Sequence, residues 1–132
     1  MKKKVKIMLL IGLVVFVLLG GYRLFYYQRV LNYKQAVQAI HFTEPDLTEV
    51  EDGEYIGEHD VDFIRAKVKV SVKDQRFTAI KMLEHYNDRG EKADALPEKM
   101  LEQQKISVDA VSGATNSSKV IQKAVEKALI KE

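Results

Sequence analysis

Residues 63–73 read Phe-Ile-Arg-Ala-Lys-Val-Lys-Val-Ser-Val-Lys, and this stretch decides the fold. From Ala66 to Lys73, small and branched apolar residues alternate with lysine and serine. Successive side chains of a β-strand point to opposite faces, so the pattern predicts one buried face and one wet face. Such a strand is typical of an antiparallel sheet that is covered on one side only.

Two further strands flank this one in the sequence. Residues 73–76 form a short polar connection, and residues 77–85 return as the second strand of a predicted hairpin. On the other side, the turn signal at residues 52–53 precedes a short strand over residues 54–58. The three segments together predict a small antiparallel sheet.

The residues after the hairpin predict a polar loop at 86–91 and then two helices. The first is expected over residues 96–104, with Pro97 tolerated in its first turn. The second is expected over residues 117–130, where apolar residues recur at helical spacing. Strands followed by packed helices predict the α+β class for this domain.

Outward from the domain, residues 1–27 predict a membrane anchor. Ile7 to Tyr22 is a run of 16 residues without a charge. A helix over residues 5–22 would be about 27 Å long, close to the ~30 Å hydrocarbon core of a bilayer. We therefore expect residues 5–27 to contact the lipid bilayer as a single-pass transmembrane helix.

Charges around the apolar run predict its orientation in the cell membrane. Four lysines precede it, and the first residue after it is Arg23; the lysines are Lys2, Lys3, Lys4 and Lys6. Positive charge before a span favours a cytoplasmic N-terminus, so the domain is expected to be extracytoplasmic. A cleavable signal peptide has a similar start, but no small-x-small cleavage site follows, which favours an uncleaved anchor.

Between anchor and domain, residues 28–46 are predicted to form a helical stem or linker. A weak apolar stripe over residues 28–40 predicts that the anchor helix continues outward, and Glu44-Pro45-Asp46 interrupts it. The folded domain is then expected over residues 47–132.

Composition excludes several classes of partner and cofactor. The 132 residues contain no cysteine, which excludes disulfides, thiolate metal sites and iron–sulfur clusters. From residue 24 onward 16 basic residues face 19 acidic ones, which argues against nucleic acid as a partner. His41 and His59 lack metal-ligand spacing to any partner, so no metal site is predicted.

Residues 109–118, Asp-Ala-Val-Ser-Gly-Ala-Thr-Asn-Ser-Ser, lead directly into the predicted final helix. Gly113 permits close backbone approach, and a helix N-terminus offers unpaired amides to an anion. The alternative is plain helix capping, because Thr115, Asn116 and Ser117 are all competent N-caps. From these residues alone both interpretations stay open.

Residues 109–115 resemble the D-x-x-[ST]-G-A-[ST] signature of the FMN-binding domain family. Residues 52–57, Asp-Gly-Glu-Tyr-Ile-Gly, are similar to the start of that domain, and Glu84-His85 and residues 96–109 also have counterparts in compact members. The resemblance covers about residues 47–132. Larger members carry a Thr-Pro-Gly-Leu-Gly type of loop where residues 86–91 stand here, so the small membrane-anchored type is favoured over a subunit of an ion pump.

The resemblance implies FMN as the cofactor, joined through its phosphate to the hydroxyl of Thr115 by a separate flavin transferase. Four residues would be read by the transferase and would shape the phosphate end of the pocket: Asp109, Ser112, Gly113 and Ala114. The alternative for Asp109 is to hold the loop by accepting backbone hydrogen bonds. Asn116 and Ser117 adjoin the acceptor, with capping as the favoured role of Ser117 and Ser118.

His85 has two interpretations: a hydrogen-bond donor to the flavin, or a half-exposed histidine at a strand end. Tyr55 and Met82 are either pocket residues or ordinary core. The resemblance implies an electron carrier rather than a substrate-converting enzyme, relaying electrons from a membrane-bound donor to an acceptor, with no catalytic residue of its own. The alternatives are a noncovalent FMN binder and a non-redox interaction or sensor domain.

Overall fold

The computed structural model describes residues 1–87 and 89–130. The chain forms two compact units, Met1–Gln35 and Ala36–Glu132. The segment boundaries predicted after residues 27 and 46 stay predictions.

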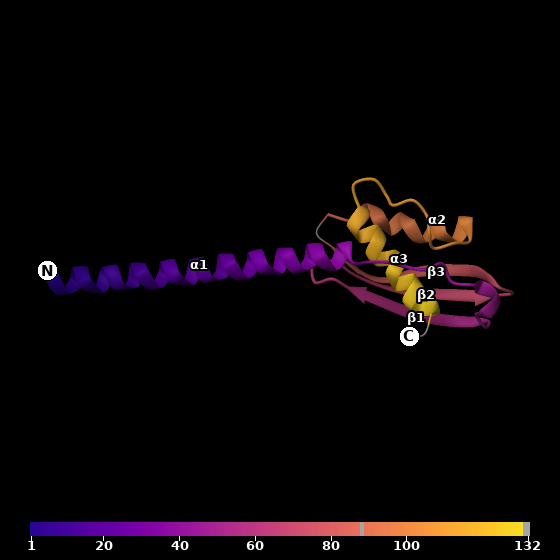
Figure 1. Cartoon of the computed structure of the whole chain (residues 1–132), viewed down its shortest axis with the longest axis horizontal. Helices are drawn as coiled ribbons and strands as arrows, with labels where there is room; N and C mark the ends of the chain where they lie inside the picture. Colours follow the sequence, from indigo (N-terminus) through magenta and orange to yellow (C-terminus); the bar gives the residue numbers. More distant parts are fainter. Residues whose placement is uncertain (88, 131–132) are drawn as a thin grey trace. The chain divides into compact units, whose positions relative to one another are not determined.

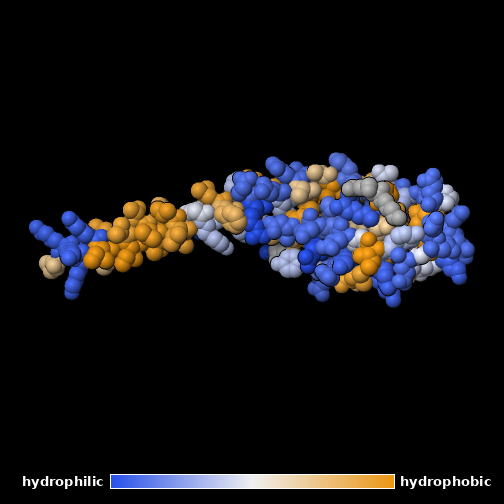
Figure 2. All heavy atoms as spheres, turned by 90° about the horizontal axis from the view of Figure 1, so that it is seen from below, coloured by the Kyte–Doolittle hydropathy of each residue, from blue (hydrophilic) through white to orange (hydrophobic). Residues whose placement is uncertain are grey.

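The helix α1 (Lys2–Gln38) is continuous, so the helix of the apolar run continues through residues 28–38, where the weak apolar stripe lies. Its most apolar window has a mean hydropathy of 2.4, and none of that window is buried inside the chain. Figure 2 shows hydrophobic side chains along this helix, with hydrophilic ones at the N-terminal end. By its length and its apolar composition, α1 could therefore cross a membrane.

Three antiparallel strands form one sheet in the order β1-β2-β3, which confirms the predicted hairpin and its neighbour. They are β1 (Gly53–Asp60), β2 (Arg65–Lys73) and β3 (Arg76–Tyr86). In the central strand β2 the predicted alternation is present, with every second residue buried: Ala66, Val68, Val70 and Val72.

Within the described residues, two helices and two short 3₁₀ turns complete the domain, giving the predicted α+β fold. The helices are α2 (Leu96–Gln103) and α3 (Thr115–Leu129), and the turns are η1 (Leu47–Glu49) and η2 (Glu91–Ala95). The apolar face of α3 packs on β1 and β2, whereas α2 packs beside β3 (Figure 1). The buried apolar residues of α3 are Val120, Ile121, Ala124, Val125 and Ala128.

Helix α3 approaches the sheet most closely at Gly57 in β1. A Cβ atom at Gly57 would overlap the carbonyl oxygen of Ala124 and lie 2.5 Å from the amide nitrogen of Ala128. Both contacts are to backbone atoms of α3, so no side-chain rotation would relieve them. The absence of a side chain at Gly57 therefore sets the distance between helix and sheet.

His59 in β1 makes the stability of the domain sensitive to acid. Burial, followed by the charges of Lys127 and Lys123 on α3, lowers the pKa of His59 from its ordinary 6.5, against the opposite pull of Asp60 and Glu126. The unfolded chain therefore binds a proton more readily, and stability falls as the pH drops through 6.5.

We expect the urea midpoint of the full chain in detergent to be lower at about pH 5.5 than at about pH 7.5. Carboxylates contribute to this fall in every variant, so the comparison with His59→Gln isolates the histidine. The variant should show a smaller fall. Equal falls in the two proteins would contradict the assignment.

Candidate functional site

The loop of residues 109–114 leads into α3, which begins at Thr115 rather than at the predicted residue 117. The N-cap position is occupied by Ala114, which makes no side-chain cap hydrogen bond, and in this sense the helix start is uncapped. The alternative in which Thr115, Asn116 or Ser117 occupies the N-cap position is therefore wrong, because all three lie within the first turn of the helix. The residue at the cap position therefore supplies no side-chain acceptor to the first-turn amides.

Thr115 is exposed at this helix start, as are Asp109, Ser112 and Gly113 from the loop, whereas Ala114 is buried. Gly113 has a φ of 80°, in the left-handed region that favours glycine. No atom lies within 4 Å of the position that a Cβ at Gly113 would occupy. The loop thus combines an accessible hydroxyl, an uncapped helix start and open space beside the glycine.

Side chains of α3 hold the loop at both ends. Gln122 is 3% exposed, and its Nε2 donates to the carbonyl oxygens of Ile106 at 3.0 Å and Val108 at 2.9 Å. The Oγ of Ser118 accepts from the amide of Val111 at 3.0 Å and donates to the carbonyl of Ala114 at 2.8 Å. The helix that begins at Thr115 therefore also fixes the segment leading into it.

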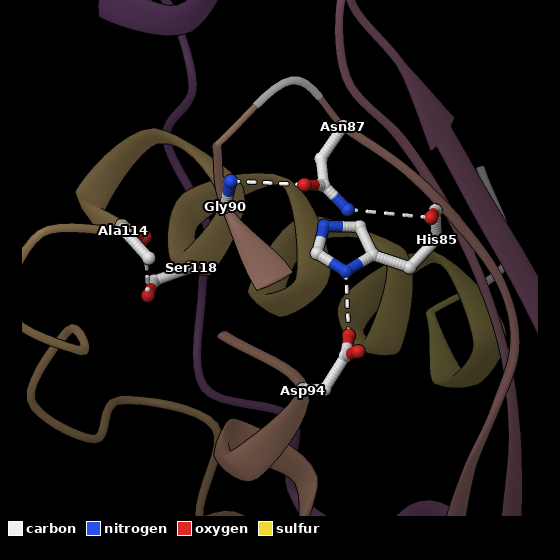
Figure 3. Close-up of polar contacts among 6 residues, drawn as sticks. All are labelled: His85, Asn87, Gly90, Asp94, Ala114 and Ser118. Atoms are coloured by element: carbon white, nitrogen blue, oxygen red, sulfur yellow. Dashed lines mark hydrogen bonds and ion pairs between the residues drawn. The ribbon is translucent and has the colours of Figure 1, made fainter. Parts of the chain in front are cut away.

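His85 lies at the end of β3 with its ring buried, since its side chain is only 4% exposed. Its Nδ1 lies 2.5 Å from Oδ1 of Asp94, and its Nε2 is buried without a hydrogen-bond partner in the described part of the chain. Figure 3 shows Nδ1 directed at Asp94 and Nε2 on the other side of the ring, toward Asn87 and Gly90. The ring is thus not half-exposed, and its predicted role toward a flavin stays a prediction.

The turn after β3 packs against the first turn of α3. The side chain of Asn87 accepts from the amide of Gly90 at 2.9 Å and donates to the carbonyl of His85 at 3.4 Å (Figure 3). A Cβ at Gly90 would overlap the Oγ of Ser117 and lie 2.7 Å from its Cβ. Ser117 is 1% exposed, so the serine adjacent to the acceptor region packs on Gly90 rather than capping the helix.

We expect Gly90→Ala to displace the start of α3 and to destabilise the domain by about 2 kcal/mol, a typical cost of overpacking. The obstacle is a single side chain, so Gly90→Ala combined with Ser117→Gly should recover most of the loss. Urea unfolding of wild type and the two variants measures both effects. A double variant no more stable than Gly90→Ala would show that Ser117 is not the obstacle.

Two other predicted site residues are placed in the sheet. The Tyr55 hydroxyl donates to the carbonyl of Glu51 at 2.7 Å, and Met82 is half-buried in β3. Asp109 has no hydrogen-bond partner for its carboxylate among residues 1–87 and 89–130. Within the same described residues no group of three or more potential metal ligands lies together.

Sequence reasoning missed four residues that build this region: Asn87, Gly90, Asp94 and Gln122. A glutamine in an amphipathic helix predicts a solvent-facing position, and a glycine in a polar loop predicts a turn. The proximity of His85 to Asp94 depends on how η2 returns beneath the end of β3, which no local pattern encodes.

Residues 62–130 match the model of the family described as FMN-binding domain. This match covers more than half of the 132 residues. The chain belongs to the FMN-binding domain family. A search of curated proteins found no match. The matched range contains β2, β3, both later helices and the whole loop 109–114, so FMN is the cofactor of this domain.

The residues present fit the phosphate of FMN. The uncapped start of α3 offers backbone amides and a partial positive charge, which suit an anion. The open space beside Gly113 leaves room for a bulky group near the exposed Thr115 hydroxyl. We conclude that the loop 109–114 and the first turn of α3 form the candidate FMN site.

Proposed function

We propose that this protein is a membrane-anchored, extracytoplasmic electron carrier whose FMN is bound covalently to Thr115. One observation carries the proposal: the exposed Thr115 hydroxyl stands at an uncapped helix start, within the family signature at residues 109–115. A residue used only for capping would have its side chain turned to the helix amides. Thr115 has no such role here.

The covalent bond would be made by a separate flavin transferase that uses FAD. The Thr115 oxygen forms a bond to the phosphorus of the FMN half of FAD. The bond between this phosphorus and the oxygen leading to AMP breaks, AMP leaves, and the hydroxyl proton is released. The product is a phosphodiester with one negative charge, which the start of α3 stabilises through its amides and dipole.

The other loop residues support this reaction by keeping the acceptor accessible. Gly113 holds the left-handed turn that no larger residue adopts without strain, and the buried Ala114 fixes the entry into α3. Ser112 and Asp109 are exposed on the loop, where a transferase can read them. When bound, FMN supplies one- and two-electron transfer, and the protein contributes its attachment and surroundings.

The proposed location rests on α1 and on the lysines that precede its apolar run. The chain has no cysteine, so a single introduced cysteine is a unique reporter. A membrane-impermeant maleimide should label Glu102→Cys, an exposed site in α2, in intact cells. Lys3→Cys should react only after permeabilisation, and the reverse result would overturn the orientation.

The carrier role predicts that the flavin stays on the chain through repeated redox cycles. Membranes holding the loaded full chain would be reduced with dithionite and reoxidised with ferricyanide. The flavin absorbance should fall and recover in each cycle, with no flavin released into the supernatant. Flavin that is lost on cycling, or that ferricyanide does not reoxidise, would contradict a bound carrier.

A further inference from the structure

Residues 41–45 stand between α1 and η1 in the sequence. We call this segment the strap, because it is hydrogen-bonded along the domain. The carbonyl of His41 accepts from Nζ of Lys123 at 2.9 Å, and the amide of Thr43 donates to Oε2 of Glu126 at 3.0 Å. Lys123 and Glu126 also pair with each other at 2.9 Å, and both side chains are largely buried. The strap is therefore fastened to the middle of α3 by backbone groups of its own.

Glu44 fastens the strap to the segment that leads into the FMN loop. Its carboxylate accepts from the amide of Ile106 at 2.6 Å, the amide of Ser107 at 2.8 Å and the Oγ of Ser107 at 2.7 Å. Three donors on one carboxylate make charge-assisted hydrogen bonds, which are stronger than neutral ones. A single side chain thus satisfies two neighbouring backbone amides.

The same segment is held from its other side by Gln122 of α3, through the carbonyls of Ile106 and Val108. Residues 106–108 are thus hydrogen-bonded both to the strap, through Glu44, and to α3, through Gln122. Asp109, the first residue of the family signature, follows directly. Where this segment is held determines where the acceptor loop starts.

We propose that Glu44 is a positioning residue for the covalent loading of Thr115, which requires the strap to be bound to residues 106–107. This inference rests on the proposed function. With Glu44 in place, residues 106–108 are held by both the strap and Gln122, and the loop presents Thr115 in one arrangement. Without Glu44 only Gln122 holds this segment, so the loop samples more conformations, and fewer of them present the hydroxyl correctly.

The strap lies outside the family-matched residues 62–130. A site confined to the matched range would not depend on Glu44. The proposal therefore extends the functional unit to the segment that directly follows α1, so that loading of the flavin depends on how this segment is docked.

The test compares loading of the full chain in detergent with purified flavin transferase and FAD, for wild type, Glu44→Gln and a matched control. Glutamine keeps the shape but turns an NH₂ donor toward one of the two amides, which loses its acceptor. The control is Glu51→Gln, an exposed glutamate in the loop before β1 whose carboxylate has no partner among the described residues. We expect Glu44→Gln to load about tenfold more slowly, and Glu51→Gln to load like wild type.

Amide hydrogen exchange separates positioning from general loss of stability. In Glu44→Gln the amides of Ile106 and Ser107 should exchange faster, while those of Val68 and Val70 in β2 should exchange as in wild type. Faster exchange at all four amides would mean that the variant is destabilised as a whole and would overturn the positioning role. The measurement needs no bound flavin.

Ser107→Ala provides a milder variant if Glu44→Gln does not fold. It removes only the hydroxyl bond to Glu44 and should slow loading by a few-fold. If wild type takes up flavin and the folded variant takes it up at the same rate, the strap proposal alone is overturned. Wild type that takes up no flavin, while the transferase modifies a control protein, overturns the proposed function and the strap proposal with it.

Discussion

Gly57→Ala is expected to lower the free energy of unfolding of the domain by about 3 kcal/mol, at the upper end of typical overpacking costs. The added methyl would overlap the backbone of α3 at Ala124 and Ala128, so the helix must move away from β1. That movement opens the interface in which the apolar face of α3 is buried. Urea unfolding of the full chain in detergent, followed by circular dichroism, measures the loss.

The expected loss of stability is opposite in sign to the effect of the same substitution at a glycine with free space around it. Where a glycine has space and an ordinary backbone, replacing it by alanine usually stabilises a protein by about 0.4–1 kcal/mol. Gly12→Ala is the control, because no atom lies within 4 Å of its Cβ position. It should leave the unfolding of the domain unchanged. A Gly57→Ala chain as stable as wild type would show that α3 does not approach β1 so closely.

Thr115→Ala is expected to abolish covalent flavin completely, because the acceptor oxygen is removed. Thr115→Ser should retain it, since serine keeps the hydroxyl at the same position of the helix start. Thr78→Ala removes an exposed threonine hydroxyl from β3, outside the signature at residues 109–115, and controls for general damage. Flavin fluorescence of the chain on a denaturing gel, after co-expression with the transferase, measures all three.

The pattern across the variants decides between acceptors. Fluorescence lost in Thr115→Ala but present in Thr115→Ser and Thr78→Ala assigns the bond to Thr115. Fluorescence that persists in Thr115→Ala would place the flavin on another residue. Since Thr115 is exposed and uses no side-chain hydrogen bond to cap α3, the alanine variant should unfold at the wild-type urea concentration.

Much of the fold could be predicted from local sequence, because local patterns determine it. The alternation in β2 requires one buried face, and the helical spacing of Val120, Ala124 and Ala128 requires a packed stripe. The sheet and α3 follow from these two patterns. The start of α3 could not be predicted in the same way, since its N-cap residue is Ala114 and the residues that favour capping, at 115–117, lie inside the helix.

The candidate site also has one part that local sequence predicts and another part that it does not. The loop at residues 109–115 could be predicted because it is continuous in sequence. The residues that hold it could not, since Glu44 and Gln122 contact residues 106–108 from opposite directions across long chain separations. The importance of Gly57 was also hidden, because it depends on which helix residue lies opposite.

The most direct test of covalent FMN on Thr115 is the intact mass of the denatured full chain, expressed with and without an exported flavin transferase. We predict an increase equal to FMN less one water, seen only with the transferase and located by peptide mapping on the peptide that contains Thr115. An unmodified mass, obtained while the same transferase modifies a control protein, would contradict the covalent account.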